Sequence, residues 1–334
     1  MSPYVLEVLA TESDFDEEGY LQANPDVKVA VERGECVSGQ VHFHEFGKRE
    51  KRKQRRTSGL ARLKAEKRKL IRPILRTDMP MVEANGCFDF LTAELRKSSN
   101  IIDTDLVASN EYQPDALDVI ERHKNGLVLD CGAGRRREYY SNIVNFEIVA
   151  YDTTDVRGVG EALPFKDNSF DAVLSLAVLE HVKDPFQCAR EIIRVLKPGG
   201  ELHCCVPFLQ PMHGYPNHYY NMTEQGIRNL FEPGISIHKH EVAQYSLPIW
   251  TLTWILNSWA SGLSEKTRSD FLNMKVSDLL DHPAKYFDKP FVTELSDAKN
   301  FELACGSTIT GTKLSEVALP PLKRWTSAVK RLFR

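Results

Sequence analysis

Two periodicities of apolar residues alternate along the chain from about residue 114 onward. A helical spacing covers residues 114–123 and 185–196, and the KPGG sequence after Leu196 predicts the end of the second helix. Short apolar or alternating runs around these helices predict strands. The predicted strands are residues 127–131, 146–151, 170–176 and 201–208, with the last two near 235–241 and 301–313. Strands that alternate with helices predict a doubly wound, mostly parallel α/β sheet.

Charge distinguishes the segment that precedes this sheet. Residues 48–76 contain 14 Lys and Arg residues against two acids, Glu50 and Glu66, although the net charge of the chain is −3. Leucine and isoleucine residues at partial helical spacing predict a basic helical linker whose charges face solvent. The alternative is attraction to the phosphates of nucleic acid or anionic lipid. No aromatic residues are interleaved for base stacking, which favours the linker and makes nucleic acid an unfavoured partner.

Composition predicts a cytoplasmic protein. The seven cysteines include no CxxC pair, and several lie in apolar runs, which is typical of a reducing compartment. The acidic N-terminus lacks the basic and apolar regions of a signal peptide. The longest uncharged stretch, residues 244–264, contains Pro248 and several polar residues. We interpret it as a buried or interfacial helix and not as a membrane span.

A glycine-rich turn follows the first predicted strand. In VLDCGAGR, residues 128–135, a strand leads into a turn where Gly132 and Gly134 let the backbone approach a ligand closely. Ligands bind at this carboxyl edge in open α/β sheets. The third glycine of a dinucleotide fingerprint is absent, since Arg135 follows Gly134, and this argues against NAD.

The residues after this turn carry a family resemblance. The sequence GEALPFKDNSFDAVLSLAVLEHVKDPFQCAREIIRVLKPGGELHCCVPF, taken together with VLDCGAG, resembles the core of class I S-adenosylmethionine (SAM)-dependent methyltransferases, in the branch that includes quinone-type enzymes. The resemblance implies a Rossmann-like, doubly wound, mostly parallel seven-stranded sheet, here preceded by a helical N-terminal extension. It also implies methyl transfer with S-adenosyl-L-methionine as the cofactor.

The same resemblance implies a set of cofactor contacts. Asp130, Gly132 and Gly134 match the loop under the methionine part of SAM, and Asp152 matches the acid that binds the ribose hydroxyls. A carboxylate can accept both hydrogen bonds of a diol. The residues that the resemblance places beside the adenine are Glu161, Ala162 and Leu163. Arg135 or Arg136 is a candidate for the SAM carboxylate.

The chain departs from the family pattern after Asp152. Only residues 153–160 separate it from Glu161, which is too short for the helix that the family usually has there. Asp155 is therefore a rival for the ribose contact. We expect another segment, such as residues 77–110, to cover the sheet face that this helix normally covers. After the glycine loop, RRREYYSN predicts a short, irregular helix.

Candidate catalytic residues lie on the loops after the fourth and fifth strands. Methyl transfer requires the acceptor to be held in line with the methyl group, and a hydroxyl acceptor also needs a base. His181 follows the fourth strand, and the loop PFLQPMHGYPNHYYNMT supplies His213 and His218 as further candidates. The aromatic residues that suit stacking on a substrate are Tyr215, Tyr219 and Tyr220. No metal site is predicted. The histidine pairs His42/His44 and His238/His240 have a spacing that suits a metal, but no further ligands lie beside them in the sequence.

The flanking segments suggest partners. Residues 14–47 resemble a short module of bacterial surface-glycan assembly proteins, which implies a protein partner. Residues 320–334 have the pattern of a basic amphipathic helix on an anionic membrane surface, or of a helix packed on its own domain. The predicted division is 1–47 interaction module, 48–76 basic linker, 77–113 lead-in, 114–313 methyltransferase domain with a Trp-rich cap at 242–300, and 314–334 C-terminal helix.

Four functions fit these patterns. The leading hypothesis is methylation of a small-molecule or glycan acceptor, such as a sugar in surface-polysaccharide biosynthesis, by a cytoplasmic enzyme with peripheral membrane contact. A second is methylation of a quinone-like or other aromatic metabolite. A third is an RNA-associated protein that acts through residues 48–76. A fourth is a noncatalytic scaffold, against which the intact glycine loop and Glu161 argue.

Overall fold

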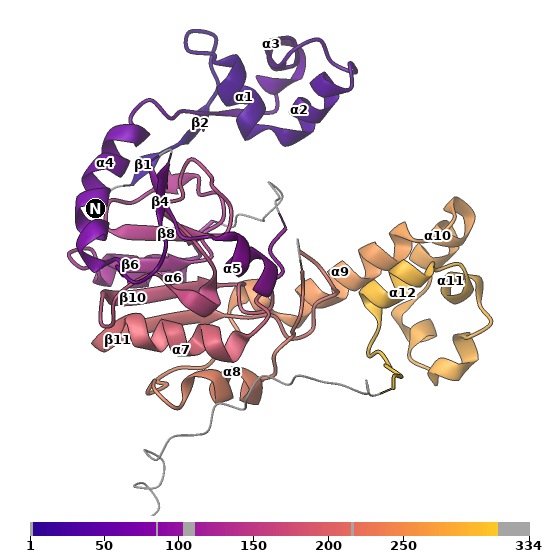
Figure 1. Cartoon of the computed structure of the whole chain (residues 1–334). Coiled ribbons are helices and arrows are strands. Elements are labelled where there is room, and N and C mark those ends of the chain that lie inside the picture. The colour runs from indigo at the N-terminus through magenta and orange to yellow at the C-terminus, as the bar shows by residue number, and fades with distance from the viewer. Residues whose placement is uncertain (1–2, 85, 103–110, 215–216, 313–334) are drawn as a thin grey trace, which may run out of the picture. The chain divides into compact units, whose positions relative to one another are not determined.

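The described residues form two compact units. The computed structural model describes residues 3–84, 86–102, 111–214 and 217–312 (Figure 1). One unit ends at Ser261 and the other begins at Gly262. The predicted C-terminal helix at 314–334 lies outside the described residues. None of the helices in the described ranges is long and apolar enough to cross a lipid bilayer.

A seven-stranded sheet forms the centre of the first unit. Its strand order is β11-β10-β6-β8-β9-β5-β4, and only the β4–β5 pair is antiparallel. This confirms the predicted doubly wound, mostly parallel α/β fold. The strands are β4 (Val82–Ala84), β5 (Cys87–Asp89), β6 (Val128–Cys131), β8 (Ile143–Glu147), β9 (Val156–Arg157), β10 (Phe170–Leu176) and β11 (Leu196–Cys205).

Helices cover the two faces of the sheet because successive strand residues point to opposite sides. On one face, Val119 and Ile120 of α6 (Pro114–Arg122) pack with Val128 and Leu174. The other face packs against α7 (Pro185–Val195), whose N-terminus is capped by the Asp184 side chain. That larger core includes Leu129, Val144, Val173, Ala189 and Ile192. The helices predicted at 114–123 and 185–196 are therefore confirmed.

The prediction of a sixth strand at 235–241 and a seventh at 301–313 is wrong for the residues that the structure describes. Residues 235–241 form no strand, and Phe301 belongs to helix α12 (Asp297–Leu303), followed by irregular chain to residue 312. The sheet instead gains β4 and β5 from the lead-in segment. Phe88 and Phe90 are fully buried there, and β5 pairs in parallel with β9. The described part of the lead-in segment therefore extends the sheet through β4 and β5.

The second central strand lies earlier in the chain than predicted. The expected strand at 146–151 is observed as β8, Ile143–Glu147, with all five residues buried. Residues 149–154 form a turn in which the Thr154 hydroxyl donates to the Val149 carbonyl at 2.8 Å. The strand therefore ends at Glu147 and not at Asp152. Glu147 is thus the acid at the carboxyl end of this strand.

Two local features also differ from expectation. The sequence RRREYYSN forms no helix, because Glu138–Tyr139 (β7) pairs with β1 (Tyr4–Val5) in a separate small sheet. The helix before KPGG does end there, at Val195, but β11 begins at once. Phe170 lies opposite Leu196 whereas Ala172 lies opposite Glu201, so the residues between form a bulge.

The N-terminal residues build a small helical cluster. Tyr20, Val27 and Phe43 form its buried core, with Phe15 stacked on Phe43 at 5.0 Å between ring centroids. A side-chain carboxylate, Asp16, caps the first helix. The elements are α1 (Glu17–Ala23), α2 (Pro25–Glu32), α3 (Gly39–His42) and a π-helical turn, η1 (Phe43–Gly47). Its predicted role as an interaction module stays a prediction.

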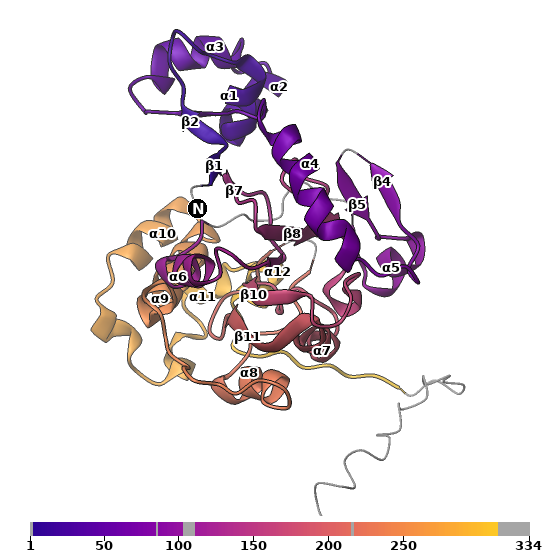
Figure 2. The ribbon, with the colours of Figure 1, turned by 90° about the vertical axis from the view of Figure 1, so that its left-hand side faces the viewer.

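The basic segment contributes a strand and a helix to the first unit. Its strand β3 (Lys53–Arg55) pairs with β2 (Glu7–Leu9), and its helix α4 (Leu60–Ile71) runs beside β8 and β5 (Figure 2). Ile71 at the end of α4 is fully buried in the larger core. The helix therefore packs beside the strands that the short 153–160 connection leaves without a helix of their own.

Cations of this segment are buried in ion pairs with the 152–155 turn. The Lys67 Nζ atom lies 2.9 Å from the Asp155 carboxylate, and neither side chain is exposed. Burial lowers the pKa of Lys67 to about 8, although Asp155 opposes the shift. The fully buried Arg55 guanidinium binds Asp152 at 2.6 and 2.8 Å. These charges are not the solvated charges that a free linker would carry.

The remaining helices lie in both units. Those of the first unit are α5 (Ala93–Ser98), α8 (Glu224–Phe231) and α9 (Pro248–Ser261). The second unit contains α10 (Glu265–Leu272), α11 (Pro290–Thr293) and α12, and the Thr267 hydroxyl donates to Glu294 at 2.6 Å. The predicted cap at 242–300 thus spans residues of both units, and its function as a cap stays a prediction.

The Lys67–Asp155 pair predicts a large stability effect. We expect Lys67→Met to lower the free energy of unfolding by about 3–5 kcal/mol, because it leaves the Asp155 charge buried without its main partner. The matched control is Lys69→Met on the same helix, whose ion pair with Glu66 is exposed and should contribute little. Urea unfolding measures both variants. Equal changes in the two variants would contradict this account.

Candidate functional site

A cleft opens at the carboxyl ends of the central strands. It has a volume of about 2420 Å³, and its lining includes Gly132, Ala133, Glu147, Glu161 and Val178. Within the sheet, β6 has β8 as its neighbour on one side and β10 as its neighbour on the other side. The cleft therefore lies at the topological switch point, where ligands bind in open α/β sheets.

The glycine loop forms the floor of this cleft. Gly132 and Gly134 have φ angles of 87° and 63°, which favour glycine. A Cβ atom on Gly132 would lie 2.4 Å from a methyl group of Val178. The backbone N–H groups of Gly132 and Ala133 both donate to the Phe146 carbonyl, at 2.9 and 3.0 Å. The loop is thus held against the end of β8.

Glu147 is the acid at this edge of the sheet. Its carboxylate accepts hydrogen bonds from the backbone N–H groups of Gly134 and Ile148, each at 2.7 Å. Burial raises the pKa of Glu147, and the backbone hydrogen bonds oppose the shift. Each carboxylate oxygen has further capacity to accept a hydrogen bond. Glu147 can therefore receive a pair of hydroxyl groups, a role that the sequence analysis did not assign to it.

Asp152 and Asp155 lie outside the cleft lining. Burial alone would raise the pKa of Asp152, but the hydrogen bond and charge of Arg55 outweigh it and lower that pKa. Asp155 is fully buried and accepts hydrogen bonds from Lys67, from the Tyr139 hydroxyl and from the backbone of Asn145. Both carboxylates are therefore engaged in ion pairs with the basic segment.

Asp130 supports the loop from behind. Its Oδ2 atom accepts hydrogen bonds from the Tyr112 hydroxyl and the Arg136 guanidinium, both at 2.6 Å. The guanidinium also lies 4.0 Å from the centre of the Tyr112 ring. Arg136 itself lines the cleft, whereas Arg135 contacts Gln22. Asp130 thus fixes the position of Arg136 at the cleft wall.

The three residues predicted beside an adenine differ in position. Glu161 lines the cleft and accepts a hydrogen bond from the Lys183 backbone at 3.0 Å. Leu163 is fully buried in the core, and its N–H donates to Glu191 at 3.0 Å. Ala162 lies in the turn between them, outside the cleft lining. Only Glu161 is therefore placed to contact a ligand directly.

The structure brings the three predicted catalytic histidines together. The ring centroid of His181 lies 5.4 Å from that of His213 and 5.6 Å from that of His218. Gly214 allows this contact, because its φ is 82° and a Cβ there would lie 2.4 Å from the His181 ring. His181 and His213 line the cleft, whereas His218 does not. Burial lowers the pKa of both His181 and His218.

Two of the predicted substrate tyrosines, Tyr219 and Tyr220, do not line the cleft. The backbone N–H groups of Tyr219 and Tyr220 donate to the Glu180 carbonyl at 2.7 and 3.2 Å, which ties the loop to the end of the fourth strand. Tyr215 lies outside the described residues. The ring of Trp254 lies 5.0 Å from the His213 ring. Trp250 and Trp254, both on α9, do line the cleft.

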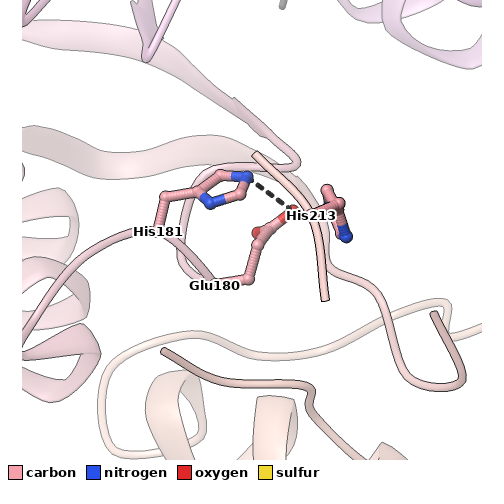
Figure 3. A group of neighbouring side chains, drawn as sticks. All are labelled: Glu180, His181 and His213. Carbon is pink, nitrogen blue, oxygen red and sulfur yellow. Dashed lines mark ion pairs between the residues drawn. The ribbon is translucent and has the colours of Figure 1, made fainter. Parts of the chain in front are cut away.

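Glu180 is a site residue that sequence reasoning missed. It is fully buried, and its Oε1 atom lies 3.8 Å from the Nε2 atom of His181 (Figure 3). Burial raises the pKa of Glu180 to about 8. The signal was present in the LEHV sequence, where a carboxylate precedes the candidate base, but its burial depends on tertiary packing.

A family comparison supports the assignment of the domain. Residues 127–204 match a family model described as a methyltransferase domain. The matched region begins just before β6 and ends in β11, so it contains the glycine loop, Glu147, Glu161 and the Glu180–His181 pair. The prediction of a methyltransferase domain is therefore confirmed for this part of the chain.

Curated relatives resemble only a short part of the chain. An uncharacterized methyltransferase of Mycobacterium avium (strain 104) is 54% identical over 54 residues, which are 16% of this chain and 21% of that protein. One of Mycobacterium tuberculosis (strain ATCC 25177 / H37Ra) is 56% identical over 45 residues, or 14% and 18% of the two chains. The chain thus matches about a fifth of the length of these relatives.

Solved structures show a distant similarity. A SAM-dependent methyltransferase of Thermotoga maritima is 23% identical, with a TM-score of 0.29 over 35% of this chain and 69% of that one. Phosphoethanolamine N-methyltransferase 2 of Haemonchus contortus, solved with S-adenosyl-L-methionine, is 16% identical, with a TM-score of 0.30 over 55% and 51% of the chains.

The glycine loop predicts a position-specific effect of added volume. We expect Gly132→Ala to destabilise the protein by about 1–3 kcal/mol more than Gly199→Ala, because it adds overlap with Val178 to the backbone strain. Gly199 is the matched control, since its φ is also positive, at 78°, and a Cβ there meets nothing within 4 Å. Chemical denaturation compares the two variants, and similar losses would contradict the overlap.

Proposed function

We propose that this chain is a class I SAM-dependent methyltransferase. The observation that carries the proposal is that the matched methyltransferase region contains the strand ends and loops that build the cleft at the switch point. SAM would supply a methyl group on a sulfonium, which is already activated for displacement. The main task of the chain is then to hold the donor and the acceptor in line.

Three parts of the cleft suit the parts of this cofactor. The Gly132–Gly134 loop allows close approach of the methionine part, because glycine at 132 and at 134 places no Cβ atom on the backbone there. Glu147 would accept the ribose hydroxyls in place of Asp152, which Arg55 engages. Glu161 would lie on the adenine side. The guanidinium of Arg136 is the cleft cation that suits the carboxylate of the methionine part.

The acceptor side of the cleft carries His181, His213 and Trp254. A hydroxyl acceptor must lose its proton, and a neutral imidazole at the cleft wall can take it. We therefore favour methylation of a hydroxyl on a small molecule or glycan. The resemblance of residues 14–47 to glycan-assembly modules motivates a sugar acceptor in surface-polysaccharide biosynthesis. An acceptor held near a membrane would fit peripheral contact through residues 320–334, which lie outside the described residues.

One observation favours a second candidate acceptor. Trp250 and Trp254 present large aromatic rings to the cleft, and such rings suit stacking on a flat substrate. Methylation of a quinone-like or other aromatic metabolite is therefore the alternative. An RNA-associated role through residues 48–76 is less favoured, because Arg55, Lys64 and Lys67 are buried against protein groups and cannot reach a phosphate backbone.

Calorimetric titration tests the cofactor and the identity of the ribose acid. We expect the wild type to bind SAM and S-adenosylhomocysteine, and not NADH. Glu147→Gln should weaken binding at least about tenfold, because hydrogen bonds to a charged acceptor contribute about 1.5–3 kcal/mol. Asp152→Asn is the matched control and should leave the affinity within about twofold.

The two variants separate the possible outcomes. Asp152→Asn should lower thermal stability, since it weakens the buried pair with Arg55. If a folded Asp152→Asn variant lost its affinity for SAM while Glu147→Gln kept it, Asp152 and not Glu147 would be the acid that binds the ribose. A folded wild type that binds neither SAM nor S-adenosylhomocysteine would contradict the proposed function. The hypothesis of a noncatalytic scaffold would then be favoured.

A further inference from the structure

A buried carboxylate lies against the histidines of the cleft. The Glu180 side chain is fully buried, and neither carboxylate oxygen has a hydrogen-bond partner among the described residues. The Nε2 atom of His181 lies 3.8 Å from the Oε1 atom of Glu180, which is beyond hydrogen-bonding distance. A buried carboxylate without a partner is costly unless a cation or a proton compensates it. Its surroundings therefore indicate what it binds.

Two histidines are held in the tautomer that a metal ion requires. The Nδ1 atom of His181 lies 2.7 Å from the Asn217 carbonyl, and the Nδ1 atom of His213 lies 2.8 Å from the Pro211 carbonyl. A carbonyl oxygen can only accept, so each Nδ1 carries the proton. The Nε2 atom of each neutral ring then has a free lone pair. Metal-ligating histidines show this arrangement, with the second nitrogen donating to a backbone carbonyl.

The third histidine has a different role. The Nδ1 atom of His218 accepts a hydrogen bond from the His213 backbone N–H at 3.0 Å, so its Nε2 must carry the proton. That Nε2 lies 3.0 Å from Oδ1 of Asn221, whose Nδ2 donates to the Gln210 carbonyl at 2.9 Å. Both ring nitrogens of His218 are therefore used, and the residue positions His213.

We propose that Glu180, His181 and His213 bind a divalent transition-metal ion, of which Zn²⁺ is the probe. One ligand atom from each residue lies within 4.8 Å of the others, and Figure 3 shows the three side chains grouped together. Two imidazoles and one carboxylate form a set that binds Zn²⁺ at catalytic sites, where a fourth position stays open. Both imidazoles line the cleft, so that position faces the acceptor side.

The ion has a chemical role that rests on the proposed function. An acceptor hydroxyl that reaches the open position would lose its proton more readily, because the cation stabilises the alkoxide. The proton leaves to solvent, the new C–O bond forms as the C–S bond of SAM breaks, and S-adenosylhomocysteine departs. This identifies the substrate class as a hydroxyl compound, and it assigns His181 and His213 to the ion and not to the base.

Metal binding is measured on the full chain without any acceptor. Chelator-treated protein is titrated with Zn²⁺ in competition with a chromophoric chelator, and the metal content is determined by mass spectrometry after dialysis. We expect one Zn²⁺ per chain, and affinity lowered at least about a hundredfold in Glu180→Gln and in His213→Ala. The control is the His238→Ala/His240→Ala double variant, an exposed pair that should leave the affinity within about twofold.

Thermal melting shows whether a variant that loses Zn²⁺ binding is still folded. Glu180→Gln keeps the size of the side chain and cannot carry a buried charge, so the metal-free variant should melt no lower than the metal-free wild type. Zn²⁺ should raise the melting temperature of the wild type and not that of the variant. Absence of Zn²⁺ binding in the folded wild type, or equal affinity in Glu180→Gln, would overturn the site. Titration with S-adenosylhomocysteine separates this result from failure of the proposed function, since Glu180→Gln should keep that affinity.

Discussion

The buried contacts between the basic segment and the 152–155 turn are the constraint on which this architecture depends. Lys67 meets Asp155 with both side chains fully buried, and Arg55 meets Asp152 at the same turn. Each charge would be costly to bury alone, so the pairs form together or not at all. They hold α4 beside β8, where the connection to the next strand is too short to supply a helix. The N-terminal segment is thus a structural part of the first unit.

This constraint separates the roles of the acids near the sheet edge. Asp152 and Asp155 neutralise cations from the basic segment, and Asp130 orders Arg136. Glu147 is left at the end of β8, with backbone N–H groups holding it at the cleft. On the opposite side of the switch point, Glu180 and its histidines define a second polar centre. Under the proposed function, Glu147 and Glu161 would contact the cofactor, and Glu180 would act in acceptor chemistry together with its histidines.

Sequence patterns predicted the parts of the fold that local interactions determine. The strands at 127–131 and 170–176, the two flanking helices and the glycine loop are all observed. The predicted end of the second strand was wrong, because the run NFEIVAYD contains two acids, Glu147 and Asp152, at either of which a strand could end. The choice depends on Arg55, which is 97 residues away from Asp152 and carries no local signal. The tautomers of His181 and His213 likewise depend on carbonyls that only the folded loop brings near.

A crystal structure of the protein with S-adenosylhomocysteine would test the central claim most directly. The account predicts that the ribose hydroxyls lie within hydrogen-bonding distance of the Glu147 carboxylate, while Arg55 keeps both of its contacts to Asp152. A ribose bound by Asp152, with Arg55 displaced from it, would contradict the account. In that case the buried ion pair would be a gate to the cofactor site and not a fixed part of the fold.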